Sequence, residues 1–386
     1  MVITCPFCFR QFSSQELRFR CSNTYCPEPL PDEIYAMARG YAPMPMGRVL
    51  VPGRRMFGQP NGVACDICGQ VSHRRICPYC HQELSEDIGH VDQRIIAIIG
   101  GRATGKTHYI ASLVNRLKNE VAQNFNVQAE MMNEETKVRW ENDFYTPLFV
   151  RKVVLQPTRP AGIDSTVRAP LMFRFTFSDG SRLRAINISF FDSAGEDMTS
   201  VDTMSVQNRY ICHADGIIFL LDPLQIPTVR QQLATSANVP PADYKASPEA
   251  IVGNLRRLFE RQQGLPPTQK VKVPVAFTLS KIDTLLPILD ASSALQRPAN
   301  HPGWLDLDDV RSVNTEISSF LSEWINPSFM IGVRNGFACY NFFGISSLGE
   351  QPDASNRLSV VSPLRVEDPF LWLLHRLGLI KGRKGG

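Results

Sequence analysis

The sequence predicts an α/β domain preceded by a small metal-binding module, and three observations support this prediction. Apolar runs of strand length alternate with segments of helical periodicity from residue 94 onwards. The first of these runs, Ile95 to Ile99, ends at paired glycines that lead into a helical pattern. Eight of the ten cysteines lie before residue 81. We therefore expect a cysteine-rich module at residues 1–90 and an α/β domain at residues 91–386.

The composition is that of a globular chain. It has 386 residues, of which 43% are hydrophobic and 20% charged, and a net charge of +4. This charge is too small to favour nucleic acid or a membrane surface as the partner. No apolar run is long enough to span a bilayer, and the N-terminal Met-Val-Ile-Thr-Cys lacks the pattern of a signal peptide. We therefore expect a cytoplasmic protein.

The module at residues 1–90 contains four close pairs of cysteines: Cys5 and Cys8, Cys21 and Cys26, Cys65 and Cys68, Cys77 and Cys80. In a cytoplasmic chain such pairs indicate metal rather than disulfides. Two thiolates on a tight turn suit one Zn²⁺, and two turns complete a closed tetrahedral site. The pattern predicts two structural zinc ions. We favour neighbouring pairs sharing an ion, first with second and third with fourth; the alternative is a cross-braced alternation.

The cysteine spacing resembles a tandem zinc ribbon, which implies a docking role for this module. Residues 1–90 carry nine arginines, no lysine and eight acidic residues. This near balance favours a protein partner over a phosphate backbone, so nucleic acid is not expected. The alternative is a zinc module that only stabilises an N-terminal cap.

The glycine-rich turn has the Walker A pattern, Gly100-x-x-x-x-Gly105-Lys106-Thr107. Backbone N–H groups of such a loop wrap a phosphate chain at the positive end of the following helix. We expect Lys106 to reach the β- and γ-phosphates and Thr107 to ligate Mg²⁺. The expected phosphate-binding residues are Gly100, Gly101, Arg102, Ala103, Thr104, Gly105, Lys106, Thr107 and His108.

The rest of the chain alternates strands and helices. We expect a helix over 107–122, a helical insertion over 118–157 and a helix near 199–212. Two further helices are expected at 249–262 and 309–324, and an amphipathic helix begins at Pro369. Strands are expected at 171–177, 183–191, 216–222, 271–279 and 337–343.

Polar residues follow three of these strands. Asp192 ends one strand, three residues before Gly195, and this pattern suits the second half of a magnesium–nucleotide site. The Asp192 carboxylate would hold the water shell of the magnesium ion. The Gly195 N–H would donate to the γ-phosphate. Ser280, Lys281 and Asp283 follow another strand. Asp283 could accept both guanine N–H groups, whereas adenine would leave it unpaired, and the Lys281 stem would stack on the base. Ser346 and Ser347 form a turn that could close over the base.

These motifs, in this order, resemble those of the translation-factor-related (TRAFAC) P-loop GTPases over residues 93–380. The insertion, the Asp192-Ser-Ala-Gly-Glu196 box and the cysteine pairs are more narrowly similar to the bacterial double-GTPase family. The resemblance implies a P-loop NTPase three-layer sandwich with a mostly parallel six-stranded sheet whose second strand is antiparallel. It also implies GTP at the carboxyl ends of the strands, another GTPase as a partner, and a place in bacterial conflict systems.

The chain departs from the family pattern at two positions. Ser280 replaces the base-recognition Asn, which weakens the expected guanine selectivity. Glu196 replaces the water-positioning Gln, so we expect slow hydrolysis. Thr158 is our choice for the switch threonine, with Thr166 as the alternative. Arg159 and Arg102 are candidates for stabilising charge on the transferred phosphoryl group.

The sequence therefore predicts a Mg²⁺-dependent GTP-binding switch with slow GTPase activity, whose zinc module couples nucleotide state to a protein partner. One alternative is a zinc-ribbon adaptor that binds nucleotide without hydrolysing it. The other is an ATPase.

Overall fold

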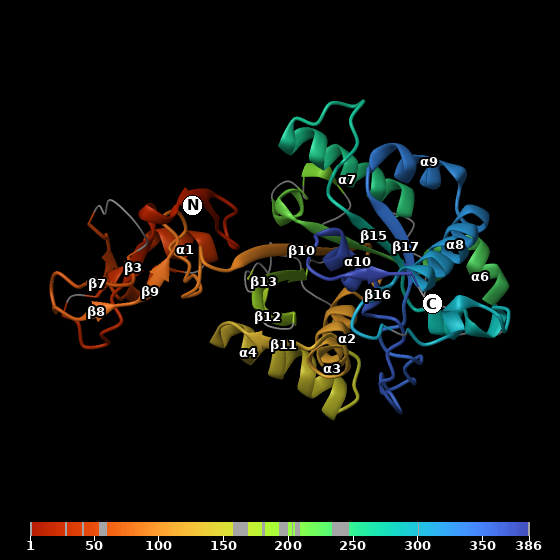
Figure 1. The fold of residues 1–386 in the computed structure, drawn as a ribbon, viewed down its shortest axis with the longest axis horizontal. Coiled ribbons are helices and arrows are strands. Elements are labelled where there is room, and N and C mark those ends of the chain that lie inside the picture. The colour runs from red at the N-terminus through yellow and green to blue at the C-terminus, as the bar shows by residue number, and fades with distance from the viewer. Residues whose placement is uncertain are drawn as a thin grey trace.

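The computed structural model describes residues 2–27, 29–40, 42–53, 60–156, 169–179, 182–192, 200–202, 204, 209–233, 247–299 and 301–384. Figure 1 shows the cysteine-rich module at one end of the long axis and the α/β domain at the other. The chain passes from the module directly into β10 (Asp92–Gly100), the central strand of the large sheet.

The central sheet has seven strands in the order β11-β12-β13-β10-β14-β15-β17. Five of them, β13, β10, β14, β15 and β17, run parallel, and β12 is antiparallel to both of its neighbours. The predicted mostly parallel sheet is confirmed, and its antiparallel strand is the one expected at 171–177, which the inserted β11 makes third along the chain. The strands span β11 Val127–Met131, β12 Leu171–Asp179, β13 Arg182–Asp192, β14 Gly216–Leu221, β15 Val275–Leu279 and β17 Tyr340–Gly344.

The seventh strand, β11, corrects the expectation of an entirely helical insertion and of six strands. Val127, Ala129 and Met131 are partly buried and alternate with exposed residues, which is the period of a strand. They pair with β12 and extend the free edge of the β12–β13 hairpin. Helices flank this strand: α3 Glu120–Phe125, α4 Glu134–Arg139 and the π-helix η2 Trp140–Val150.

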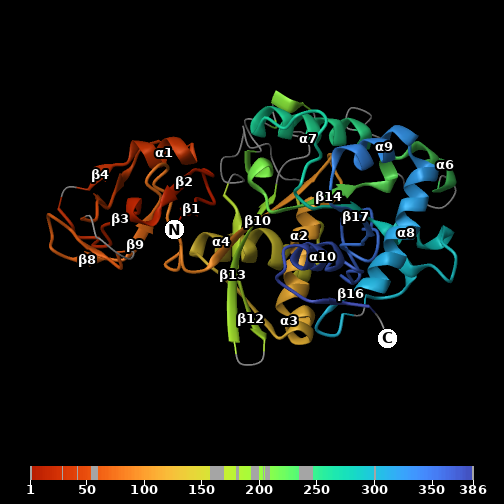
Figure 2. The ribbon, with the colours of Figure 1, turned by 45° about the horizontal axis from the view of Figure 1, so that its top comes forward.

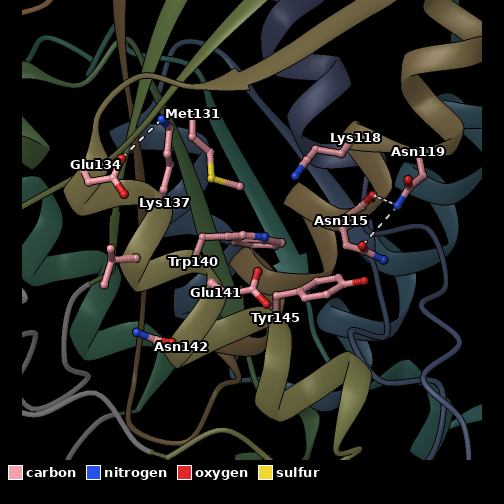
Figure 3. A pocket seen from close by; sticks show the side chains of 11 residues that line it. Asn115, Lys118, Asn119, Met131, Glu134, Lys137, Trp140, Glu141, Asn142 and Tyr145 are labelled. Atoms are coloured by element: carbon pink, nitrogen blue, oxygen red, sulfur yellow. Dashed lines mark hydrogen bonds and ion pairs between the residues drawn. The ribbon is translucent and has the colours of Figure 1, made fainter.

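An open pocket of about 560 Å³ lies between α2, α4 and η2. Figure 3 shows Trp140 and Tyr145 in this pocket, with the Lys118 side chain directed toward the indole. The Lys118 ammonium lies 5.9 Å from the Trp140 ring centroid. None of the predicted nucleotide-binding residues lines this pocket.

Helices cover both faces of the sheet, as the predicted three-layer sandwich requires, and Figure 2 shows both layers. In β10, Ile96 and Ile98 pack toward the core beneath α2 (Lys106–Lys118), η2 and α10 (Asp368–Arg376). Ile95, Ala97 and Ile99 pack toward the opposite core. That core lies beneath α6 (Pro227–Leu233), α7 (Pro248–Gln263) and α9 (Pro327–Gly336), and it also includes residues of α8 (Leu307–Trp324).

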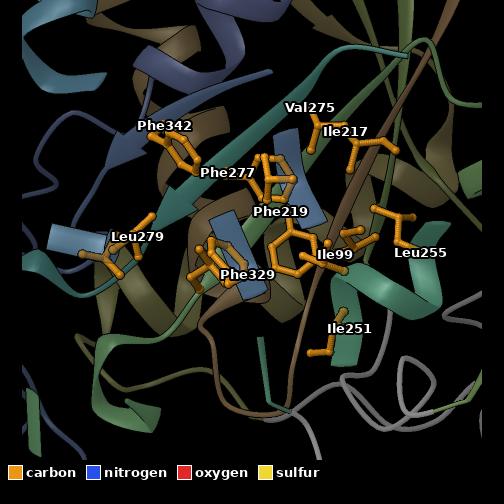
Figure 4. Close-up of a cluster of buried hydrophobic side chains, with 14 of the residues drawn as sticks. Ile99, Ile217, Phe219, Ile251, Leu255, Val275, Phe277, Leu279, Phe329 and Phe342 are labelled. Atoms are coloured by element: carbon orange, nitrogen blue, oxygen red, sulfur yellow. The ribbon is translucent and has the colours of Figure 1, made fainter. Parts of the chain in front are cut away.

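Aromatic side chains fill the second of these cores. Figure 4 shows Ile251 of α7 and Phe329 of α9 in one cluster with Phe219 and Phe277 of the sheet. The Phe219 and Phe277 rings, on neighbouring strands, lie 5.3 Å apart between centroids. The predicted helices at 249–262 and 309–324 are thus present, with ends one or two residues away. Six of the fourteen residues in the helix expected at 199–212 fall outside the described ranges. Of the others, residues 201, 202 and 204 are helical, with the Met204 N–H donating to the Ser200 carbonyl at 3.0 Å, and the last four belong to the 3₁₀ helix η5 (Arg209–His213).

Short elements complete the fold. In the module they are β1 Val2–Thr4, β2 Gln11–Ser13, η1 Ser14–Glu16, β3 Arg18–Arg20, β4 Leu30–Pro31, α1 Glu33–Arg39, β5 Pro45–Met46, β6 Val49–Leu50, β7 Val63–Ala64, β8 Val71–Ser72 and β9 Arg74–Ile76. In the α/β domain they are η6 Pro223–Gln225, η8 Ile282–Thr284, η9 Leu286–Ile288, η10 Ala294–Gln296, β16 Leu305–Asp306 and β18 Gly382–Arg383.

The module has a small core of its own, built from cysteines and residues such as Phe12, Leu17 and Phe19. It contacts the α/β domain through polar pairs as well as through packing. Arg39 pairs with Glu135 at 2.6 Å, and the Asp87 carboxylate accepts a hydrogen bond from the Asn187 amide at 3.0 Å. Among the helices that the structure describes, none combines the length and the apolar character needed to cross a bilayer.

Candidate nucleotide and metal sites

The predicted nucleotide-binding residues follow strands that end at one edge of the sheet. The register places Asp192 of β13 beside Ile98 of β10, and Leu220 of β14 beside Gly100. Farther along the sheet, Leu279 of β15 lies beside Gly344 of β17. Because these strands are parallel, their carboxyl ends meet at the same edge, which is where ligands of open α/β sheets bind.

The phosphate loop is tightly packed against β14. A Cβ atom on Gly100 would lie 2.6 Å from the Leu220 carbonyl oxygen, so only glycine fits there. Ala103 and Gly105 have φ values of 59° and 86°, in the left-handed region that lets the chain curl before α2 begins. The Thr104 hydroxyl donates to the Gly101 carbonyl at 3.0 Å and braces this curl.

Lys106 and Thr107 lie in the first turn of α2 and contact the loop and β13. The Lys106 ammonium donates to the carbonyl oxygens of Gly100 and Gly101 at 3.0 and 2.8 Å, which fixes it over the loop. The Thr107 hydroxyl donates to Asp192 Oδ2 at 3.0 Å. Residues 85 positions apart in the chain thus bring a hydroxyl and a carboxylate together at the N-terminus of a helix. Both are oxygen ligands of the kind that Mg²⁺ accepts directly or through water.

Several predicted residues fall outside the described ranges. These are Gly195 and Glu196 after β13, and Thr158, Arg159 and Thr166 in the segment before β12.

Asp283 and Ser346 meet at the neighbouring strand ends. Asp283 is half-buried in η8, and this burial raises the pKa of its carboxyl group. The Ser346 hydroxyl donates to Asp283 Oδ1 at 2.5 Å and accepts a hydrogen bond from the Gly349 N–H at 2.9 Å. The two predicted base-recognition segments are therefore linked directly to each other.

Lys281 is held by a partner that the sequence analysis missed. Its ammonium lies 2.7 Å from Asp222 Oδ2, at the end of β14. The Asp222 side chain is fully buried and also accepts the Leu224 N–H. The sequence contained a signal for Asp222, because it is an aspartate directly after an apolar run of strand length. Ser280, in the position of the family Asn, donates its hydroxyl to the Leu221 carbonyl at 3.0 Å.

His108 and Ser347 bind other parts of the chain. The His108 ring accepts the Leu155 N–H through Nε2 at 3.0 Å. Burial, with a smaller contribution from the charge of Lys281, lowers the His108 pKa to about 4, so the ring is neutral at physiological pH. The Ser347 carbonyl accepts the Ser112 hydroxyl of α2 at 2.6 Å. These bonds tie α2 to the segment before residue 157 and to the β17 turn.

The eight cysteines of the module form two clusters of four. One contains Cys5, Cys8, Cys77 and Cys80, and the other Cys21, Cys26, Cys65 and Cys68. Four sulfur–sulfur distances across the pairs are 3.7 to 3.9 Å. A tetrahedron of thiolates about 2.3 Å from Zn²⁺ has edges of about 3.8 Å, so both clusters fit zinc.

The pairing expected from the sequence is wrong: the first cysteine pair joins the fourth, and the second joins the third. The reason is the antiparallel pairing of β3 with β9, in which Arg18 lies beside Ile76 and Arg20 beside Arg74. Cys21, after β3, therefore meets the β7–β8 hairpin that precedes β9. Cys77, after β9, meets the start of β3 and the β1–β2 hairpin next to it. Along the chain, the cysteines of the second cluster therefore all lie between the first and the last pair of the first cluster. We call this arrangement nested.

The chain is similar to several known proteins. A Mycolicibacterium smegmatis protein named "Putative ESX-1 scaffolding and assembly protein SaeC" is 28% identical over 401 residues, which cover 97% of this chain and 99% of that protein. The solved Arl6 BBS3 small GTPase from Trypanosoma brucei, with bound GppNp, is 11% identical, covering 74% of this chain and 98% of its own, at a TM-score of 0.30. Roco2 RocCORdC of Methanosarcina barkeri, bound to GDP, is 12% identical, covering 67% and 44%, at a TM-score of 0.24. Residues 94–323 match the family model Double-GTPase 2, and the chain belongs to this family.

Proposed function

We propose that this chain is a Mg²⁺-dependent GTP-binding switch that hydrolyses GTP slowly. The observation that carries the proposal is the contact between Thr107 and Asp192, at the strand edge where Asp283 also lies. Phosphate, magnesium and base recognition would then occupy one continuous edge of the sheet.

Each residue has a distinct role in this proposal. The loop from Gly100 to Gly105 wraps the phosphates with backbone N–H groups, and Lys106 neutralises the β- and γ-phosphates. Thr107 and Asp192 would hold Mg²⁺ and its water shell, and the ion would supply charge neutralisation between the phosphates. Asp283 accepts the two N–H groups of guanine, while the Asp222 pair anchors the end of the Lys281 stem that stacks on the base.

Slow hydrolysis follows from the residue at position 196. A glutamate can orient a water molecule, but its negative charge opposes the charge that develops on the attacking oxygen. We propose Thr158 as the switch threonine, and Arg159 or Arg102 as the cation that stabilises the transferred phosphoryl group.

The cysteine-rich module, residues 1–90, would dock a protein partner. Sixteen large hydrophobic side chains are exposed in the part of the chain that the structure describes, and ten of them belong to this module. Examples are Tyr25 (91% exposed) and Met37 (83%). Such exposure favours a protein surface as the partner. The partner could be a second GTPase of a conflict system, or a component of an assembly such as the one named for the mycobacterial relative. The grouping of eight cysteines for metal rather than for disulfides favours a cytoplasmic location.

Equilibrium binding of labelled GTP and ATP in the presence of Mg²⁺ tests the proposal. We expect GTP to bind and Lys106→Ala to lose binding, with Lys118→Ala, at the other end of α2, as the matched control. No measurable GTP affinity would refute the proposal, and preferential ATP binding would identify an ATPase.

A single-turnover assay separates the switch from the second candidate, a nucleotide-binding adaptor, which the charge at Glu196 favours. Release of inorganic phosphate that Lys106→Ala abolishes supports the enzyme. GTP binding with no phosphate release supports the adaptor.

A further inference from the structure

Three of the four cysteine turns in the module share one backbone geometry. In each, the N–H of the residue after the second cysteine donates to the carbonyl of the first. The bonds are Phe9 to Cys5 at 3.0 Å, Gly69 to Cys65 at 2.9 Å, and His81 to Cys77 at 3.1 Å. These residues have φ values of 61°, 72° and 53°. The turn therefore requires the left-handed region, which glycine adopts freely and which a bulky side chain adopts only under strain.

The two bulky residues at this position each make contacts that a glycine could not. The His81 ring bonds both carboxylate oxygens of Asp32 at 2.9 Å, within the module. Phe9 instead packs against the core of the α/β domain. Strained residues persist where the surrounding structure holds them, and they concentrate at functional positions.

Phe9 contacts both chain segments that border the sequence after Asp192. Its ring is stacked on His213 of η5, with centroids 5.2 Å apart and planes 9° apart. It also lies 5.6 Å from the ring of Phe191, the residue directly before Asp192. Phe191 in turn stacks on Tyr210 of η5 at 4.5 Å. One aromatic cluster therefore joins the zinc turn, the end of β13 and η5.

We propose that Phe9 is a positioning residue that couples the Cys5–Cys8–Cys77–Cys80 zinc cluster to Asp192. The cluster fixes the turn that carries Phe9, Phe9 packs on Phe191, and Phe191 fixes the strand end that presents Asp192 to Thr107. A complete zinc cluster holds Asp192 in place for the nucleotide and so favours nucleotide binding. Because coupling between two sites is reciprocal, nucleotide binding favours zinc binding by the same factor. This inference rests on the proposed function.

The test uses the zinc-loaded full chain and a chelator of known zinc affinity. Zinc retained at equilibrium is measured with and without saturating Mg²⁺ and GTPγS, after direct binding of labelled GTPγS has been established for each variant. In the wild type we expect nucleotide to raise the affinity for one of the two zinc ions by about 5-fold or more, the lower end of typical coupling.

Phe9→Gly removes the ring but keeps the backbone geometry, as Gly69 does in the second cluster. We expect this variant to bind two zinc ions and GTPγS, with zinc affinity independent of nucleotide. Tyr79→Ala is the matched control, because Tyr79 lies in the same zinc cluster but contacts Phe12 and Arg10 within the module. This variant should retain the coupling.

The outcomes are distinguishable. A wild type that binds GTPγS with unchanged zinc affinity refutes the coupling and leaves the proposed function intact. Coupling that survives in Phe9→Gly, or that disappears equally in Tyr79→Ala, refutes the role of Phe9. A wild type that fails to bind GTPγS refutes the proposed function, and this inference with it.

Discussion

Asp283→Asn tests base recognition most sharply. The carboxylate accepts one hydrogen bond from Ser346 and would accept two from guanine. An asparagine keeps one acceptor, which the Ser346 hydroxyl can still reach, but presents an N–H group where guanine offers its own exocyclic N–H₂. Xanthine has a carbonyl at that position. We therefore expect the variant to prefer xanthosine triphosphate over GTP.

The magnitude follows from the bond to the exocyclic N–H₂ of guanine, which the asparagine cannot accept. A hydrogen bond to a charged group contributes about 1.5–3 kcal/mol. Its loss makes the GTP Kd of the variant at least about 10 to 10² times weaker. Competition of each triphosphate against labelled GTPγS or labelled xanthosine triphosphate measures both affinities. The Asp290→Asn variant, at an exposed carboxylate after η9, is the matched control and should leave the preference unchanged.

Stability should change in the opposite direction from GTP affinity. Burial raises the pKa of Asp283 above the ordinary 3.8, so the ionised carboxylate at neutral pH costs the nucleotide-free fold some stability. A neutral asparagine removes this cost, and the gain vanishes as pH falls below 3.8, where the aspartate is protonated in both states. We therefore expect a higher denaturation midpoint at pH 7. Unchanged GTP preference would remove Asp283 from the site, and a lower midpoint would refute the argument from burial.

Three further predictions concern the clusters, the phosphate loop and a buried histidine. Elemental analysis should find two zinc ions per chain and one in the double variant Cys5→Ser, Cys77→Ser; a double variant without zinc would contradict the nested pairing. Gly100→Ala should weaken GTP binding about 5- to 150-fold, because overpacking against Leu220 costs about 1–3 kcal/mol, while zinc content stays at two; unchanged affinity would contradict this packing. Burial alone would lower the pKa of His301, but the carboxylate bonded to its ring outweighs burial and raises the pKa above 6.5. The stability that this ion pair contributes is complete below pH 6.5 and is lost as pH rises through the raised pKa. The thermal midpoint of His301→Gln should therefore depend less on pH than that of the wild type. An equal dependence on pH in the two proteins would contradict this prediction.

The positions of the site residues at strand ends could be predicted because local signals determine them. An apolar run of five or six residues marks a buried strand, and polar residues after it fall at its carboxyl end. Asp192, Ser280 and Ser346 all lie where this rule places them, and parallel register then brings them to one edge. The rule would also have found Asp222, which ends β14 in the same way.

Contacts between distant segments could not be predicted from such signals. The charged composition of the insertion is compatible with helix, and β11 forms only because the β12–β13 hairpin offers a free edge. His108, expected among the phosphate-binding residues, is half-buried, and its ring accepts the Leu155 N–H where the chain returns to α2. Such a return depends on loop geometry that the spacing of residues in the sequence does not encode.

The nested zinc clusters show why the spacing of the cysteines in the sequence predicted the wrong pairing. Short gaps favour neighbouring pairs because loop closure is least costly there. The β3–β9 pairing outweighs this cost, since it buries Phe19 and Ile76 fully and brings the distant cysteines within reach. As a result, one cluster joins the beginning of the chain to the turn that follows β9. That cluster can be complete only when the whole module has folded, and Phe9, carried on its first turn, then reaches Phe191.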